Sequence, residues 1–126
     1  KGFHEVVDGK AKIVASLTAN FNRVEGMSVT ENILQGNNDI KGIFAHNDEM
    51  ALGAVEAAAS AGKKIVIVGF DATDDAVAAV KEGRMAATVA QQPGEMGKVA
   101  VETALKIING ESVPSSLPVI VSLITK

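Results

Sequence analysis

The sequence contains no cysteine, no tryptophan and no tyrosine among its 126 residues. Without cysteine the chain can form no disulfide bond, has no thiol nucleophile and offers no thiolate metal ligand. Four phenylalanines are its whole aromatic content, and the formal net charge is −3. A nucleic-acid-binding domain usually carries a basic surface interleaved with aromatic side chains. The composition therefore predicts that nucleic acid is not a partner.

Long apolar runs are missing as well. No stretch approaches the roughly 20 apolar residues that a membrane-spanning helix needs. The chain starts without methionine and has neither the basic nor the apolar region of a signal peptide, so we expect such a peptide to be absent or already removed. The length, with 47% apolar and 21% charged residues, suits one ordinary globular domain that spans residues 1–126.

The sequence also lacks the motifs that mark common enzyme sites. It has no glycine-rich phosphate-binding loop, no nucleophile elbow of the form G-x-S-x-G and no zinc motif of the form H-E-x-x-H. His46 stands two residues before Asp48, which could form an acid/base pair, but no activated nucleophile accompanies them. We therefore expect a protein that is not an enzyme and that binds neither a metal nor a cofactor.

Short apolar segments rich in Val, Ile and Phe recur along the chain. They are mostly continuous rather than alternating, which is typical of parallel strands covered on both faces. We predict five strands, at residues 12–19, 40–45, 65–70, 85–90 and 118–125. Helical patterns separate them, and the clearest apolar stripe runs from Met96 to Ile108. This alternation predicts an α/β fold, a flavodoxin-like three-layer sandwich with a mostly parallel five-stranded sheet.

Residues that begin and end helices agree with this pattern. Asn47, Asp48 and Thr73 stand where helix N-caps belong, and the acidic residues that follow suit the positive end of the helix dipole. A residue in the left-handed conformation commonly ends a helix, and glycine takes that conformation most easily. The glycines that follow helical runs are Gly36, Gly62, Gly83 and Gly110.

Residues just beyond the predicted strands are candidates for a binding site, because ligands of open α/β sheets bind at the carboxyl ends of the strands. The candidates are Phe21, Asn47, Asp71 and Gln91. A polar set with one carboxylate and one ring suits a neutral ligand that is rich in hydroxyl groups. Each residue also has an ordinary structural explanation, namely core packing, a helix cap, a turn and a strand end, in that order. Their convergence on one edge of the predicted sheet favours the binding site.

Several stretches of the sequence resemble one known family. They are "ANFNRVEGMSVTENIL", "IFAHNDEMALGAVEAAASAG", "IVIVGFDAT", "AVKEGRMAATVAQQP" and "VIVSLITK". Together they are similar to the C-terminal lobe of the ribose-binding members of the periplasmic sugar-binding proteins, which feed ABC importers. The resemblance covers nearly the whole chain. Repressors of the LacI type carry stretches like "NDEMALGA", so the effector-binding lobe of such a repressor is an alternative.

The resemblance implies a role for each candidate residue. Asn47 would hydrogen-bond sugar hydroxyls, and Asp71 would accept hydrogen bonds from a pair of hydroxyls. Gln91 would complete the polar wall, and Phe21 would pack against the sugar ring. The implied ligand is ribose or a similar monosaccharide, and the implied location is periplasmic or extracytoplasmic. In the intact protein the implied partner is an ABC permease.

The chain departs from the family pattern in three places. An arginine that contacts the sugar just upstream of the match to Gly2 and Phe3 is not in this chain, and His46 stands where the family pattern implies a glutamine. An acidic residue of the family pattern is also missing from the neighbourhood of Asn20 and Asn22. Intact family members enclose the sugar between two similar lobes, and this chain matches one. We therefore expect sugar binding to be millimolar or undetectable. A ligand-free engineered half-domain scaffold is a further alternative.

The helix expected at residues 94–109 packs, by the family topology, on the other lobe. In an isolated lobe its apolar stripe needs another partner. It could dock on its own sheet, or it could exchange with a second copy and form a homodimer through the swapped helix. The position of this helix in the structure separates these arrangements.

Overall fold

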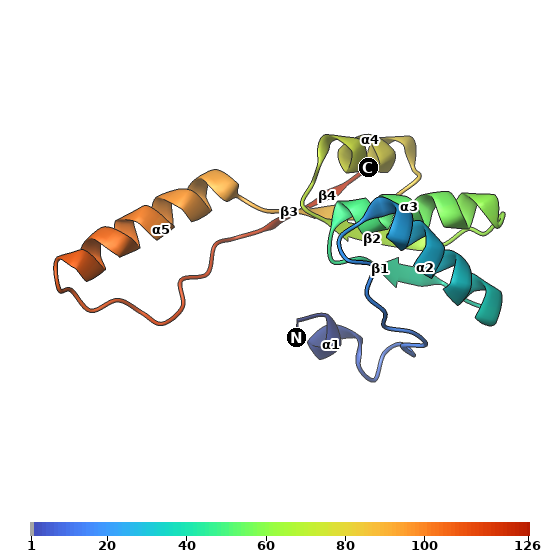
Figure 1. Ribbon diagram of the computed structural model, residues 1–126, viewed down its shortest axis with the longest axis horizontal. Helices are drawn as coiled ribbons and strands as arrows, with labels where there is room; N and C mark the ends of the chain where they lie inside the picture. Colours follow the sequence, from blue (N-terminus) through green and yellow to red (C-terminus); the bar gives the residue numbers. More distant parts are fainter. Residues whose placement is uncertain (1) are drawn as a thin grey trace.

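The computed structural model describes residues 2–126, so the first residue of the predicted domain, Lys1, lies outside the described part. Figure 1 shows helices and strands alternating along most of the chain. In order they are α1 (Gly2–Val7), α2 (Arg23–Gly36), β1 (Gly42–Phe44), α3 (Asp48–Ser60), β2 (Val66–Phe70), α4 (Asp74–Glu82), β3 (Ala87–Ala90), α5 (Pro93–Ile108) and β4 (Ser122–Thr125). The predicted α/β class is confirmed.

The strands form one sheet in the order β1-β2-β3-β4. The first three are parallel, with Phe44 beside Val68 and Val68 beside Ala87, and β4 runs antiparallel to β3. The predicted mostly parallel sheet is therefore confirmed, but the prediction of five strands is wrong. Since successive parallel strands are neighbours and crossovers are right-handed, α3 and α4 lie side by side on one face of the sheet.

The segment at residues 12–19 is the predicted strand that does not form. It has no regular secondary structure and joins no strand, and Leu17 is 66% exposed although Ala19 is buried. An apolar run favours burial, but a strand also needs a partner edge to satisfy its backbone groups. The neighbouring edge strand, β1, is only three residues long and offers little ladder to pair with.

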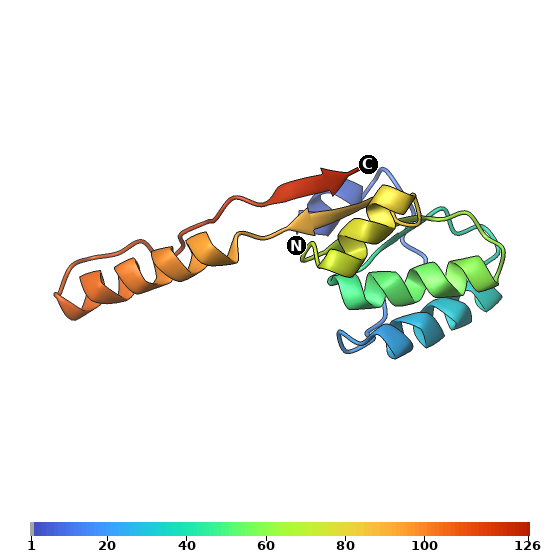
Figure 2. The same ribbon diagram turned by 90° about the horizontal axis from the view of Figure 1, so that it is seen from above.

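The core lies between the sheet and helices α3 and α4. Alanine dominates it, and Ile67 and Val80 are its largest fully buried apolar side chains. Small side chains let the helix backbones approach the strands closely, so the layers pack without large cavities at the contact. Helix α2 packs on α3, which in Figure 2 lies between α2 and the strands.

Two glycines set the close approach of α2 to α3. A Cβ atom added at Gly26 would lie 2.8 Å from the Cα of Met50, and one added at Gly53 would meet the backbone oxygen of Arg23 and lie 2.7 Å from the nitrogen of Met27. These obstacles are backbone atoms, which cannot rotate away. Glycine is therefore required at both positions by the distance between the helices.

The opposite face of the sheet is covered in part by α1, which the sequence pattern did not predict. Phe3 in α1 stacks on Phe44 in β1 with 5.2 Å between ring centroids. Val66, on the same face, stays 58% exposed. This face is therefore much more open than the face that carries α3 and α4.

Helix α5 extends away from the sheet, as both Figure 1 and Figure 2 show. Its apolar side chains are largely exposed, among them Val101 at 62% and Ile107 at 57%. It does not dock on its own sheet. The segment that follows α5 leads back to the sheet, where β4 pairs with β3. Neither α5 nor any other helix in residues 2–126 is long and apolar enough to cross a membrane.

The helix ends agree with three of the four glycine predictions. Gly62, Gly83 and Gly110 have positive φ angles of 62°, 79° and 77°. Gly36 is instead the last residue of α2, and Asn37 follows it in an extended conformation. The prediction at Gly36 is wrong because an extended C-cap ends this helix without a left-handed residue.

We predict that Gly53→Ala destabilises the fold by about 1–3 kcal/mol, because the added methyl group has no space against α2. Urea unfolding followed by circular dichroism measures the change. The matched control is Gly97→Ala in α5, where an added Cβ meets nothing within 4 Å. Both substitutions raise helix propensity equally, so a Gly53→Ala variant as stable as Gly97→Ala would contradict the packing argument.

Candidate functional site

The carboxyl ends of the three parallel strands lie at one edge of the sheet. Asp71 and Gln91 directly follow β2 and β3, and Asn47 begins α3 just after β1. Because the three strands are neighbours in the order β1-β2-β3, these side chains come from adjacent positions along that edge. The topology thus carries three of the four predicted site residues to the edge where ligands of open α/β sheets bind.

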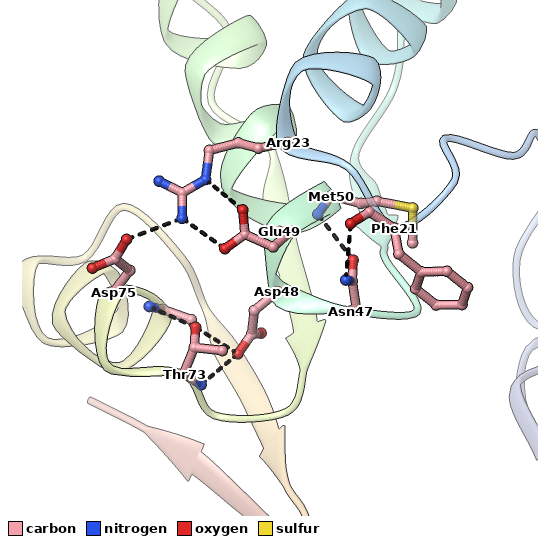
Figure 3. A network of polar contacts seen from close by, with 9 residues as sticks. Phe21, Arg23, Asn47, Asp48, Glu49, Met50, Thr73 and Asp75 are labelled. Carbon is pink, nitrogen blue, oxygen red and sulfur yellow. Dashed lines mark hydrogen bonds and ion pairs between the residues drawn. The ribbon is translucent and has the colours of Figure 1, made fainter.

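Asn47 links the start of α3 to the fourth predicted residue, Phe21. Its Oδ1 accepts a hydrogen bond from the amide of Met50 at 3.0 Å, which makes Asn47 the predicted N-cap. Its Nδ2 donates to the carbonyl oxygen of Phe21 at 3.4 Å (Figure 3). The side chain of Phe21 is 66% exposed, so core packing does not explain the ring.

Asp71 and Gln91 form the second pair. Nε2 of Gln91 donates a hydrogen bond to Oδ1 of Asp71 at 2.6 Å. Asp71 is exposed, and its Oδ2 makes no hydrogen bond to another group in residues 2–126. The carboxylate therefore keeps acceptor capacity for a group that approaches from solvent, while Gln91 fixes its orientation.

The backbone around the candidate residues adopts unusual conformations. The described residues other than glycine with positive φ are Asn20 at 49°, Phe21 at 55°, Asp71 at 121° and Ala72 at 55°. Such conformations cost on the order of 1–3 kcal/mol each and persist where surrounding contacts enforce them. The two strained pairs lie directly before α2 and directly after β2, and each contains a predicted site residue.

Hydrogen bonds enforce the conformation of the turn after β2. The amide of Asp71 donates to the carbonyl of Val89 at 2.9 Å, and the amide of Ala72 donates to Oγ1 of Thr88 at 3.2 Å. The amide of Thr73 donates to Oδ2 of Asp48 at 2.8 Å (Figure 3). Three consecutive amides of the turn are thus satisfied by β3 and α3.

Asp48 is the buried centre of this arrangement. It is fully buried, and its Oδ1 accepts a hydrogen bond from the hydroxyl of Thr88 at 2.7 Å. Gly69 makes room for it, because a Cβ added at Gly69 would meet Oδ1 of Asp48. From the sequence, Asp48 was expected at the start of a helix and was considered as a partner of His46, but its buried hydrogen bonds to Thr73 and Thr88 were not predicted. The available signal was Thr88, a lone polar residue in an otherwise apolar strand.

Arg23 joins three helices beside the candidate site, a role that was not predicted from the sequence. Its Nε and Nη2 donate to the two carboxylate oxygens of Glu49 at 3.0 and 2.8 Å, and Nη2 also donates to Asp75 at 3.0 Å (Figure 3). These hydrogen bonds, first to Glu49 and then to Asp75, raise the pKa of the Arg23 guanidinium above its ordinary value. The cation thereby ties the N-termini of α2, α3 and α4 together.

Other chemistry finds little support in the described part of the chain. No cluster of three or more His, Cys, Asp or Glu side chains in residues 2–126 could hold a metal ion. The acid/base pair considered for His46 and Asp48 is not assembled, because Asp48 is bonded to Thr73 and Thr88 instead. The ring of His46 packs edge-on against Phe44, with 5.4 Å between ring centroids.

Comparisons with known proteins support the resemblance to the periplasmic sugar-binding proteins. A family model described as a periplasmic binding protein domain matches residues 1–112. The ribose import binding protein of Haemophilus influenzae is 50% identical over all of this chain and 44% of its own length. The ribose import binding protein of Bacillus subtilis is 49% identical over 92% of this chain and 38% of its own length.

A solved structure is similar as well. A crystal structure of an ABC transporter periplasmic solute binding protein from Actinobacillus succinogenes, with bound D-allose, matches with a TM-score of 0.80 and 42% identity. The match covers 90% of this chain and 41% of that one. The chain therefore spans less than half the length of the relatives it matches.

We predict that Arg23→Gln lowers the free energy of unfolding by roughly 1 kcal/mol, because it removes a bidentate ion pair with Glu49 in which the side chain of Arg23 is only one-third exposed. Urea unfolding at low and at high salt measures the free energy of unfolding of the variant and the parent. The difference between them should shrink at high salt, because salt screens the ion pairs of the parent. The matched control is Arg84→Gln, whose ion pair with Glu82 is about half exposed and joins only the end of α4 to the turn that follows it. Equal effects of the two substitutions would contradict the role given to Arg23.

Proposed function

Given that the chain belongs to the periplasmic binding protein family, we propose that it is the C-terminal lobe of a sugar-binding protein that serves an ABC importer. In this proposal the carboxyl edge of the sheet binds ribose or a similar monosaccharide. The names of the relatives support this, since they are binding proteins for ribose import and a solute binding protein with bound D-allose. In this proposal the protein binds its sugar and does not catalyse a reaction.

The observation that carries the proposal is the pairing of Asp71 with Gln91 at the sheet edge. A carboxylate held by one neighbour and open on its other oxygen is suited to accept hydrogen bonds from vicinal hydroxyls. Asn47 stands at the end of the adjacent strand and can add an amide contact. The exposed ring of Phe21 offers a flat apolar surface for the C–H face of a sugar.

We expect the affinity of this chain alone to be low. Strong small-ligand sites enclose most of the ligand surface, whereas Asp71 and Phe21 are exposed. Each polar contact at an open edge competes with water, so its net contribution is small. In our proposal a second lobe, which the resemblance to the two-lobed family implies for the intact protein, supplies the opposite wall. The intact protein then lies outside the cytoplasm and delivers its sugar to an ABC permease.

The exposed stripe of α5 supports the same division into lobes. In our proposal α5 packs on the second lobe and belongs to it structurally, while residues 2–90 with β4 form the lobe described here. The exposed apolar side chains of α5 support this arrangement because a lone helix without tertiary packing is only marginally stable. A homodimer through exchanged α5 helices is the alternative way to cover the stripe.

We predict that ribose shifts the amide resonances of residues 47 and 71 in heteronuclear NMR spectra, with a millimolar dissociation constant, and that arabinose and galactose bind less well. Asp71→Asn should weaken ribose binding roughly tenfold, because the side chain keeps its size and shape but the neutral amide lacks the charged acceptor.

The matched control for Asp71→Asn is Asp39→Asn. Asp39 is an exposed carboxylate that pairs with Lys41 before the amino end of β1, away from the candidate site. Its replacement should leave ribose binding unchanged. Equal affinity of Asp71→Asn and the parent would remove Asp71 from the site. No shift in the parent at the highest ribose concentration would favour the ligand-free scaffold.

We predict that the amides of α5 exchange with solvent at least tenfold faster than those of α3, because α5 has little tertiary packing to protect it. Hydrogen exchange at several protein concentrations measures this, with sedimentation on the same samples. Protection of α5 that rises with concentration, together with a dimer in sedimentation, would instead support the exchanged helix.

A further inference from the structure

The hydrogen bonds that connect the turn at Asp71 and Ala72 to Thr88 and Asp48 have a fixed donor-to-acceptor direction. The hydroxyl of Thr88 has a single hydrogen, and it donates this hydrogen to Oδ1 of Asp48 at 2.7 Å. A lone pair of the same oxygen therefore receives the amide of Ala72 at 3.2 Å. The result is a relay from the Ala72 amide through the Thr88 hydroxyl to a carboxylate that can only accept.

The second carboxylate oxygen of Asp48 accepts hydrogen bonds from Thr73, which is the N-cap of α4. Oδ2 accepts from the Thr73 amide at 2.8 Å and from the Thr73 hydroxyl at 3.3 Å. The hydroxyl of Thr73 in turn caps α4 by accepting from the amide of Ala76 at 3.4 Å. One carboxylate therefore fixes both the turn after β2 and the start of the next helix.

Neither Thr88 nor Asp48 can touch a ligand at the open edge. Both have no exposed surface, whereas Asp71 is exposed. The turn between them has positive φ at Asp71 and Ala72, a conformation that residues other than glycine adopt only where contacts hold them. Any effect of the buried pair on a ligand must therefore pass through the turn.

We propose that Thr88 and Asp48 are positioning residues that hold the strained turn at Asp71 and Ala72, and so aim the Asp71 carboxylate at the ligand. The effect on affinity rests on the proposed sugar-binding function, but the effect on the turn does not. The end of β3 contributes at three points, since Val89 and Thr88 hold the turn's backbone and Gln91 holds the Asp71 side chain.

The test compares Thr88→Val, which keeps the shape but removes the hydroxyl, with Thr88→Ser, which keeps the hydroxyl. We expect Thr88→Val to speed hydrogen exchange of the Ala72 amide at least tenfold relative to that of Val68 in β2. We expect it to weaken ribose binding at least fivefold. Thr88→Ser should restore both quantities to within twofold of the parent.

Thr30→Val is the matched control, because Thr30 is also a buried threonine, in α2, but lies outside the relay. It should change protection of all core amides by the same factor and leave ribose affinity unchanged. If Thr88→Val behaves like Thr30→Val, or Thr88→Ser fails to rescue, the proposal is wrong. Thr88→Cys, with a weak thiol hydrogen-bonding group, gives the same comparison if Thr88→Val does not fold.

A double variant separates the positioning role from general destabilisation. If Thr88 acts through Asp71, then Thr88→Val should weaken ribose binding less than twofold in a chain that already carries Asp71→Asn. Full additivity of the two losses would contradict the proposal. If the parent binds no ribose, the proposed function fails, and the exchange of the Ala72 amide still decides whether Thr88 holds the turn.

Discussion

The carboxyl edge of the sheet depends on one buried carboxylate. Asp48 sits at the first turn of α3 and accepts hydrogen bonds from Thr88 in β3 and from Thr73 at the start of α4. A charged group without exposed surface is tolerated only where such partners replace water. Since Asp48 lies in α3 and its partners lie in β3 and at the N-cap of α4, the burial of Asp48 fixes the relative positions of these three elements.

The same arrangement explains how strained backbone persists where the candidate residues stand. Asp71 and Ala72 keep positive φ because each of their amides, and that of Thr73, is bonded to β3 or α3. Near the same edge, the guanidinium of Arg23 in α2 pairs with Glu49 in α3 and with Asp75 in α4. Loops that carry candidate ligand contacts are thus attached to rigid elements, which reduces the ordering cost of binding.

The open surfaces of the molecule have a common explanation in our proposal. One face of the sheet keeps Val66 exposed, and the apolar side of α5 has little cover from the rest of the chain. The chain spans 44% of the length of the ribose import binding protein of Haemophilus influenzae. A second lobe would cover α5 and complete the binding site at the same time, which links the stability of α5 to the affinity for sugar.

The sequence by itself determined the α/β class, the mostly parallel sheet, the caps at Asn47 and Thr73, and the resemblance to the periplasmic sugar-binding proteins, all of which are confirmed. These features follow from local periodicity, from capping chemistry and from motif spacing. The roles given to Phe21, Asn47, Asp71 and Gln91 stay predictions, although the structure places Asn47, Asp71 and Gln91 along one edge and joins Phe21 to Asn47.

Only the tertiary structure decided the number of strands, the position of α5 and the roles of Asp48, Thr88 and Arg23. Residues 12–19 carry the apolar pattern of a strand, but pairing depends on a partner edge that local sequence does not describe. The partners of Asp48 are 25 and 40 residues away in the chain, and those of Arg23 are 26 and 52 residues away. Contacts over such separations arise when the chain folds, because the sheet brings distant strand ends together at one edge.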